Sequence, residues 1–397
     1  MSISDQFGSN SDPSLAEPIV VRRKKKYGRK ILIFILLLLP VLSASILLRL
    51  MTMKYPIFSQ RAKVSDGWTT LRGVFNVSIG HDQDASSVLS GIFKEGMDFA
   101  VISNQNGVDL KDIASNAPLA TIPSQDVVCS RGHFVTLGMN RHIEPNEAEA
   151  GDTFRRLRKA GGWSVIIHGV GGPDRWKAWD EMLPEGFEFL SASRYSESVG
   201  LLARIARVAG SLLSSPAGQD FLGVRPNEAL ARWDDYLRKG RVLGVCGIDS
   251  RGSYESPLTF VLVQDGLGPY GADEVRASLF DGHFYCAIPI YGDCSGFRFF
   301  ARPSGGGSTL GIMGDRVKLG EGVELWAGLN LGRSIKSKIS FALIHDGKQV
   351  ARVRGNSIAY EVKSAGAYRV EVSVSTSGII FSDENRVFIY SNPIFIE

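Results

Sequence analysis

The sequence predicts an α/β domain that follows one hydrophobic segment near the amino terminus and precedes a small β-sandwich. Three observations support this prediction. Residues 74–106 have the pattern of a strand, a helix and a second strand. Several later apolar runs end in polar residues, as buried strands of parallel sheets do at their carboxyl ends. From residue 323 onward, short alternating segments are separated by turn signals, which is typical of antiparallel β structure.

Length, charge and cysteine content exclude several protein classes. A chain of 397 residues can contain more than one hydrophobic core, so two folded domains are expected. The formal net charge of +4 is small, and most of the positive excess lies before residue 31. We therefore expect no nucleic-acid binding. Four cysteines are too few for a disulfide framework, and their spacing fits no zinc ribbon or knuckle.

The amino-terminal segment has the features of a membrane anchor. Residues 1–30 are an expected disordered tail that ends in a dense cationic block. The uncharged, Leu- and Ile-rich run within residues 31–50 would reach roughly 27 Å as a helix, close to the hydrocarbon thickness of a bilayer. We expect a single-pass helix in the inner (cell) membrane with a cytoplasmic amino terminus and a periplasmic or extracellular main domain. A cleaved signal peptide is the alternative, because residues 43–45 (Ser-Ala-Ser) resemble a cleavage site.

The predicted α/β domain covers residues 71–304, after a linker at residues 51–70. Strands are expected where apolar, β-favouring runs are short, and helices where apolar residues recur every three or four positions. The expected strands are residues 74–79, 99–102, 117–128, 134–138, 163–167, 187–190 and 242–246. The expected helices are residues 85–95, 144–160, 198–213, 226–238 and 272–280. Gly96 follows the first of these helices, as helix-terminating residues do.

Residues 305–397 are predicted to form the β-sandwich. The run Gly-Gly-Gly-Ser at residues 305–308 indicates a flexible joint. Asp346-Gly347 between two strand-like runs is a strong hairpin signal. Expected strands here are residues 339–345, 349–354, 358–362, 367–374 and 386–390.

The four cysteines fall into two groups. Cys286 and Cys294 are separated by a loop containing Pro and Gly, and they could pair in an oxidising compartment. Cys129 and Cys246 lie on expected core strands, where a buried free thiol is the ordinary state.

Polar motifs recur where the expected strands end. The first strand contains Asn76-Val77-Ser78, and the second is followed by the run 103–106 (Ser-Asn-Gln-Asn). His133 follows Gly132, and His168 follows the strand at residues 163–167. The strand at residues 242–246 leads to residues 249–251 (Asp-Ser-Arg).

In order and spacing these motifs resemble the PHP (polymerase and histidinol phosphatase) family of metal-dependent phosphoesterases. Further matches are residues 95–99 (Glu-Gly-Met-Asp-Phe), at the family's helix end, and Asp126, where the family has a metal-binding Glu. The resemblance covers about residues 71–397, including a carboxyl-terminal appendix that ends in Ser-Asn-Pro-Ile. It implies a distorted (β/α)7 barrel followed by a small β-sandwich.

In the family, His, Asp and Glu side chains at these positions hold up to three divalent ions. Five matching positions here carry amides, a hydroxyl or a guanidinium, which bind transition metals poorly. These five residues, expected to line a polar pocket for a ligand, are Asn76, Ser78, Asn104, Gln105 and Arg251. Four positions keep metal-binding side chains: Asp126, His133, His168 and Asp249. His81, Asp82 and Asp84, in the loop after the first strand, could partly substitute for the lost ligands.

Two functions follow from the resemblance. In the first, the domain is a degenerate, non-catalytic relative that binds an anionic small molecule or a protein partner. In the alternative, it is a hydrolase of the metal-dependent phosphoesterase type with one zinc or manganese ion held by Asp126, His133 and His168, since two His and one carboxylate suffice for a catalytic zinc. Asp249 would then be a fourth ligand or the catalytic base, and Arg251 would bind a phosphate group. We favour the first function because the multi-metal site is lost.

Overall fold

The computed structural model describes residues 33–34, 36–41, 43–44, 61–62, 64–79, 84–104, 117–138, 150–170, 175–180, 182–191, 225–247, 257–266, 270–289, 292–330, 339–375 and 385–397. The chain forms two compact units, Met1–Lys54 and Tyr55–Glu397. In the first unit, all the described residues are helical. Within the described residues, no helix is both long and apolar enough to cross a membrane. Much of the expected span at residues 31–50 lies outside the described residues, so the span stays a prediction.

The second unit begins with nine strands and four helices in its described part. The strands are β1 (Trp68–Ile79), β2 (Phe99–Asn104), β3 (Ala120–Cys129), β4 (Gly132–Leu137), β5 (Trp163–Ile167), β6 (Gly186–Ser191), β7 (Leu243–Gly247), β8 (Leu258–Gln264) and β9 (Phe284–Ala287). The helices are α2 (Ala85–Lys94), α4 (Ala150–Lys159), α7 (Asn227–Lys239) and α8 (Ala272–Asp281). The expected helices at residues 85–95, 226–238 and 272–280 are confirmed as α2, α7 and α8, whereas residues 198–213 lie outside the described residues.

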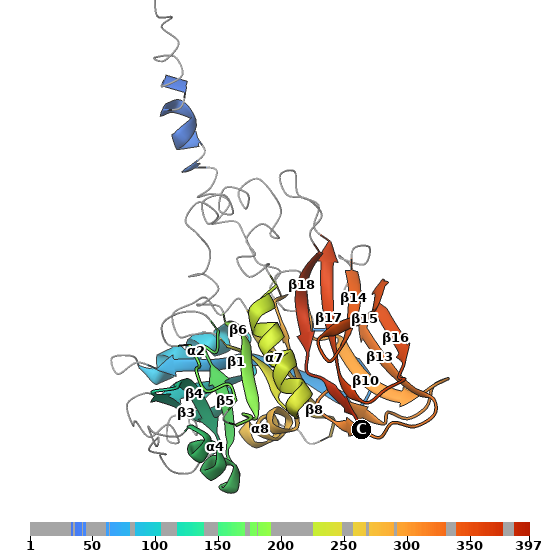
Figure 1. Cartoon of the computed structure of the whole chain (residues 1–397). Helices are drawn as coiled ribbons and strands as arrows, with labels where there is room; N and C mark the ends of the chain where they lie inside the picture. Colours follow the sequence, from blue (N-terminus) through green and yellow to red (C-terminus); the bar gives the residue numbers. More distant parts are fainter. Residues whose placement is uncertain are drawn as a thin grey trace, which may run out of the picture. The chain divides into compact units, whose positions relative to one another are not determined.

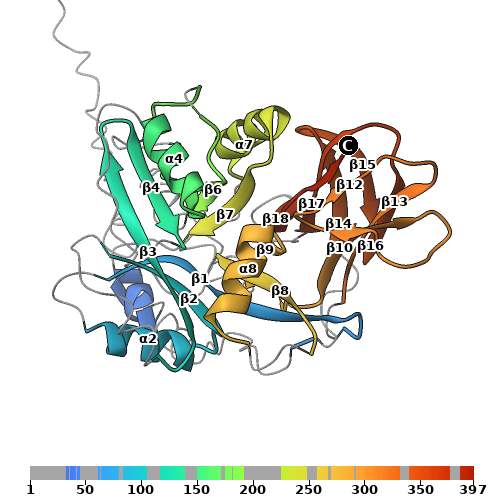
Figure 2. The same cartoon turned by 90° about the horizontal axis from the view of Figure 1, so that it is seen from below.

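These strands form one curled sheet with the order β9-β8-β1-β2-β3-β4-β5-β6-β7. The last strand, β7, also lies near β1, β8 and β9, so the sheet turns back on itself. The pairs β1–β2, β2–β3, β5–β6 and β6–β7 are parallel, but β3–β4, β4–β5, β1–β8 and β8–β9 are antiparallel. The arrangement is therefore mixed α/β and departs from a regular alternation of parallel strands and helices (Figures 1 and 2).

The inner face of the curled sheet holds a separate hydrophobic core. Its strand members come from alternate positions of β1–β5 and β7–β9, as expected for strands whose side chains alternate between two faces. They include Leu71, Val101, Val135, Val165 and Val245. Helix α8 adds Val275 and Leu279 to the same cluster. The inner core therefore packs inside the curled sheet and supports the carboxyl ends of its parallel strands.

The remaining strands form a carboxyl-terminal β region, defined here as residues 297–397. Its strands are β10 (Phe297–Pro303), β11 (Gly311–Ile312), β12 (Arg316–Val317), β13 (Val323–Leu329), β14 (Ile339–His345), β15 (Lys348–Arg354), β16 (Ser357–Glu361), β17 (Gly366–Ser375), β18 (Asn385–Ser391) and β19 (Ile394–Ile396). Strands β11-β10-β13-β16 form one sheet, and the others extend the large sheet through β18, which pairs with β9. Residues from both sheets share one hydrophobic cluster, which is consistent with the expected sandwich. The domain boundary at residue 304 stays a prediction.

The disulfide differs from the sequence prediction. Cys246 at the end of β7 is bonded to Cys286 on β9, with the two Cα atoms 5.9 Å apart. The expected pairing of Cys286 with Cys294 is therefore wrong, and so is the expectation of a free thiol at Cys246. Because the sheet turns back on itself, β7 lies near β9, and the two cysteines come together. Cys294 is buried, and its thiol donates a hydrogen bond to the Gly292 carbonyl oxygen at 3.5 Å.

Candidate functional site

Three serines lie in register across the carboxyl ends of β1, β2 and β3. Ser78 on β1 is the partner of Ser103 on β2, which is the partner of Ser124 on β3. The three strands are parallel, so their side chains at matched positions lie on the same face, about 4.8 Å apart from strand to strand. Ser103 and Ser124 each follow a member of the inner core, Val101 and Ile122, by two residues. Side chains two residues apart on a strand point to the same face, so the serines lie at the inner face of the curled sheet.

A bulge in β1 places Asn76 beside this row. Val74 pairs with Ala100 and Val77 pairs with Ile102, so two residues of β1 face the single residue Val101 of β2. Asn76 is one of the two, and it has a φ of 61°. Asn tolerates this left-handed conformation better than other non-glycine residues do. The sequence at this point therefore permits a backbone that turns the Asn76 side chain out of the regular strand alternation.

Two histidines lie together on the neighbouring strands. His133 is the second residue of β4, directly after a tight turn from β3, and it pairs with Ile167 at the end of β5. His168 follows Ile167, and the ring centroids of His133 and His168 are 5.9 Å apart. Gly132, just before His133, allows Trp176 to pack close to this turn, because a Cβ there would lie 3.0 Å from the Cα of Trp176.

Glu188 on β6 contacts His168. Its Oε2 accepts a hydrogen bond from the backbone N–H of His168 at 2.9 Å and lies 3.7 Å from His168 Nδ1. His168 has a φ of 53°, so the carboxylate holds a residue in an unfavourable backbone conformation. Gly247, at the end of β7, faces Glu188, and a Cβ there would overlap Glu188 Oε1. Only the structure shows that Glu188 positions His168.

We use the term strand-end cluster for Asn76, Ser103, His133, His168 and Glu188. Two of its side chains are buried polar groups with incomplete hydrogen bonding. Asn76 is 4% exposed and Ser103 is fully buried. Neither Asn76 Oδ1 nor Ser103 Oγ has a hydrogen-bond partner among the residues that the structure describes. Leaving such a group unsatisfied costs about 1–3 kcal/mol, so both atoms are suited to receive a ligand.

The predicted metal ligands are only partly brought together. His133 and His168 are neighbours, but His133 lies opposite Val128 on β3, two residues beyond Asp126. Two residues of antiparallel strand span about 7 Å. In the described ranges, no group of three or more His, Cys, Asp or Glu side chains could hold a metal ion. The described residues alone therefore do not complete a metal centre.

Several predicted site residues cannot be placed. Gln105, Asp249 and Arg251 lie outside the described residues, as does the side chain of Asn104. His81 and Asp82 also lie outside them. Asp84 is described, and its carboxylate caps helix α2 by accepting hydrogen bonds from the backbone N–H groups of Ser86 and Ser87. An N-cap is an ordinary structural role for Asp.

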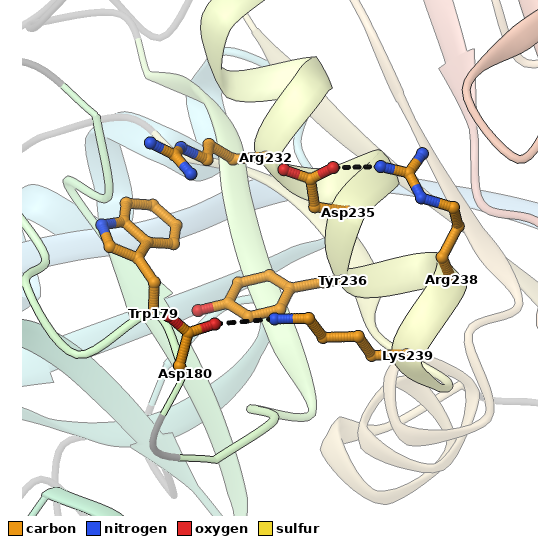
Figure 3. A pocket seen from close by; sticks show the side chains of 7 residues that line it. All are labelled: Trp179, Asp180, Arg232, Asp235, Tyr236, Arg238 and Lys239. Carbon is orange, nitrogen blue, oxygen red and sulfur yellow. Dashed lines mark hydrogen bonds and ion pairs between the residues drawn. The ribbon is translucent and has the colours of Figure 1, made fainter.

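A separate pocket of about 270 Å³ lies on the outer side of helix α7 (Figure 3). It is lined by Trp179, Asp180, Arg232, Asp235, Tyr236, Arg238 and Lys239. Lys239 pairs with Asp180 at 2.9 Å, Arg238 pairs with Asp235, and Arg232 lies over the Trp179 ring at 4.9 Å. Burial and the nearby Asp180 raise the pKa of Tyr236 well above its usual range. The charged groups of this pocket are satisfied mainly by one another.

Comparisons with known proteins give a limited result. No family model matches the sequence, and no curated protein matches it. A solved structure from Bacteroides vulgatus ATCC 8482, a two-domain protein containing a predicted PHP-like metal-dependent phosphoesterase, aligns with a TM-score of 0.40 and 13% identity. The alignment covers 85% of this chain and 99% of that chain. A similarity this low places no constraint on the function of this protein.

Proposed function

We propose that the main domain is a non-catalytic, PHP-like binding domain that takes an anionic small molecule at the strand-end cluster. The observation that carries the proposal is the pair of buried polar atoms, Asn76 Oδ1 and Ser103 Oγ, which have no partner among the described residues. They lie at the carboxyl ends of strands, where α/β sheets bind their ligands. The imidazoles of His133 and His168 support the anionic part, because imidazole N–H groups donate hydrogen bonds to phosphate or carboxylate oxygens.

The location of the domain is part of this proposal. Residues 31–50 would anchor the chain in the cell membrane, with the cationic block on the cytoplasmic side and the main domain in the periplasm or outside the cell. The disulfide between Cys246 and Cys286 supports an oxidising compartment, where such bonds persist. Protease added to intact spheroplasts should digest the main domain. Protection of that domain would contradict the orientation.

Calorimetric titration of the detergent-solubilised full chain with inorganic phosphate tests the anion site. We expect binding by the wild type and a loss of about tenfold or more in His133→Gln, because a hydrogen bond to a charged group is worth about 1.5–3 kcal/mol. His345→Gln is the matched control, since His345 stacks on Tyr368 in the carboxyl-terminal β region. Equal losses in both variants, or no binding by the wild type, would reject the proposal.

The alternative is a hydrolase with one metal ion, and the contact between the rings of His133 and His168 favours it. Equilibrium dialysis against zinc or manganese separates the two functions. One equivalent of metal in the wild type and none in His168→Ala would support the alternative, as would hydrolysis of a generic phosphodiester. Metal bound equally by both proteins would show binding elsewhere in the chain.

A further inference from the structure

Arg232 differs from the other charged side chains that line the pocket on helix α7. Those side chains form two ion pairs, whereas Arg232 forms no ion pair or hydrogen bond within the described part of the chain. Its guanidinium lies over the Trp179 ring, with the central carbon 4.9 Å from the ring centroid. Stacking fixes the plane of a guanidinium and leaves its N–H donors at the edge, where a carboxylate can accept two of them. Arg232 therefore offers a preformed site for a carboxylate.

The hydroxyl of Tyr236 is a second unengaged group in the same pocket. Tyr236 is 2% exposed, and its hydroxyl has no hydrogen-bond partner among the described residues. The Trp176 indole is close to it, but an indole N–H only donates, so the hydroxyl proton still needs an acceptor. Burial raises the pKa of Tyr236, which keeps this proton in place at neutral pH. The hydroxyl is thus a second donor for an anionic group.

A cation and an anion both lie near this hydroxyl. Arg232 and Asp180 act on its pKa in opposite directions, and in Figure 3 the hydroxyl points toward the side of the pocket where Trp179 and Asp180 lie. Asp180 accepts a hydrogen bond from Lys239 at 2.9 Å, which holds the pKa of Asp180 below its usual value. A carboxylate accepts more than one hydrogen bond, so Asp180 can take a second cationic donor beside Lys239.

The size of the pocket limits the ligand. Its volume of about 270 Å³ lies just below the roughly 300–1,000 Å³ of pockets for drug-sized ligands. A ligand that uses both Arg232 and Asp180 needs a carboxylate and an ammonium group close together in this small space. Free α-amino acids carry these two groups on one carbon atom.

We propose that the pocket on helix α7 binds a small, free α-amino acid. The ligand carboxylate accepts hydrogen bonds from the Arg232 guanidinium and the Tyr236 hydroxyl, and the ligand ammonium group donates to Asp180. A surface whose charges only neutralise one another would explain the two ion pairs, but it would explain neither Arg232 nor the buried hydroxyl. This site is separate from the strand-end cluster and does not depend on the function proposed there.

Calorimetric titration of the detergent-solubilised full chain with glycine, L-alanine and L-serine tests the proposal. Propionate and ethylammonium are the matched references, because each resembles L-alanine but keeps only one of its two charged groups. We expect at least one amino acid to bind at least tenfold more tightly than either reference, since two charged groups are engaged instead of one. Trialanine carries the same two charges far apart and should bind no better than propionate, which separates a free amino acid from a peptide.

Three substitutions assign the contacts. Arg232→Met should weaken amino-acid binding about tenfold or more, and Asp180→Asn should remove the preference for an amino acid over propionate. Tyr236→Phe should weaken binding severalfold without lowering the unfolding temperature, because it removes only an unengaged hydroxyl. Arg276→Met is the control, since Arg276 pairs with Asp273 on the exposed side of α8, and it should leave the affinity unchanged.

Three outcomes would overturn the proposal. In the first, no amino acid binds more tightly than propionate and ethylammonium. In the second, propionate binds as tightly as L-alanine, which would make the pocket a simple anion site. In the third, amino acids bind, but Arg232→Met and Asp180→Asn keep the wild-type affinity, so the ligand lies elsewhere. Thermal unfolding of each variant without ligand shows whether a lost affinity comes from a lost fold.

Discussion

The strand-end cluster and the contact between helix α7 and strand β17 both bury polar groups, but they satisfy them differently. At the second place Arg369 is 1% exposed. It donates two hydrogen bonds to the carboxylate of Asp234 at 3.0 Å and one to Glu371 Oε1 at 2.6 Å. Arg225 donates two more to Glu371, at 2.9 and 2.7 Å. We call these four residues the ion-pair network. Two cations face two anions, and each carboxylate receives at least two donors.

The difference indicates separate roles for the two regions. The ion-pair network is complete without a ligand, and it joins α7 to the carboxyl-terminal β region through side chains of fixed geometry. The strand-end cluster keeps Asn76 Oδ1 and Ser103 Oγ without partners among the described residues. A saturated polar network fixes structure, whereas an unsaturated one lowers stability unless a ligand completes it. Removing a polar group should therefore have opposite effects in the two regions.

The largest effect is expected for Arg369→Met. The substitution leaves the buried carboxylates of Asp234 and Glu371 without their main partner, which typically reduces the free energy of unfolding by about 3–5 kcal/mol. Urea unfolding followed by tryptophan fluorescence measures the loss. Arg276→Met is the control, because Arg276 pairs with Asp273 on the exposed side of α8 and should change stability by less than about 1 kcal/mol. Similar losses in both variants would show that the network does not stabilise the fold.

The disulfide should give the next largest effect. Replacing Cys246 and Cys286 by serine removes a bond that closes a loop of 40 residues, and such a change typically reduces the free energy of unfolding by about 2–4 kcal/mol. Reductant should destabilise the wild type by a similar amount and leave the double variant unchanged. Peptide mapping without reduction should link the peptides that contain Cys246 and Cys286. A link between Cys286 and Cys294 would contradict the structure.

The sequence predicts the local elements well because they depend on residues close in the chain. The strand, helix and strand around residues 74–104 are present as β1, α2 and β2, and their apolar spacing is sufficient to predict them. The register between strands depends on distant contacts. The alignment of Ser78 with Ser103 and Ser124, the bond between Cys246 and Cys286 and the pairing of β1 with β8 could not be read from any local pattern.

The candidate site was predicted unevenly for the same reason. Polar residues gather at strand ends, and the motifs of His133 and His168 placed both residues at such ends. The two rings are neighbours in the structure. Asp126 lies two residues away from Val128, the residue that pairs with His133. This offset is set by the pairing of β3 with β4, which no local pattern predicts. The roles of Ser103 and Glu188 depend on which atoms lack or find partners, and residue type alone does not give that information.

The ion-pair network should also make stability depend on acid pH. Burial alone would raise the pKa of Glu371, but Arg369 and Arg225 outweigh burial and hold it below its ordinary value of 4.5. A carboxyl group whose pKa is lower in the folded state stabilises the fold above its unfolded pKa and loses this contribution as pH falls. Unfolding free energy measured by urea titration should therefore decline below about pH 4.5. The decline should be shallower in Glu371→Gln, and an equal slope in both proteins would contradict the role of the ion pairs.

The smallest effect is expected for two serines in the same register. Ser124→Ala removes a hydroxyl that donates to the Ile102 carbonyl oxygen and should reduce the free energy of unfolding by about 1 kcal/mol. Ser103→Ala removes a buried hydroxyl without a partner in the described part of the chain, so the unliganded protein should keep its stability or gain up to about 1 kcal/mol. Urea unfolding of the two variants without ligand measures the difference in sign.

This pair of variants is the sharpest test of the comparison, because the two changes remove the same atoms from neighbouring strands. A saturating ligand that stabilises the wild type by more than it stabilises Ser103→Ala would show that the ligand completes the unsaturated hydroxyl. If both variants lose the same amount of stability without ligand, Ser103 Oγ is already satisfied by water. The strand-end cluster would then be as saturated as the ion-pair network, and its buried polar atoms would no longer indicate a binding site.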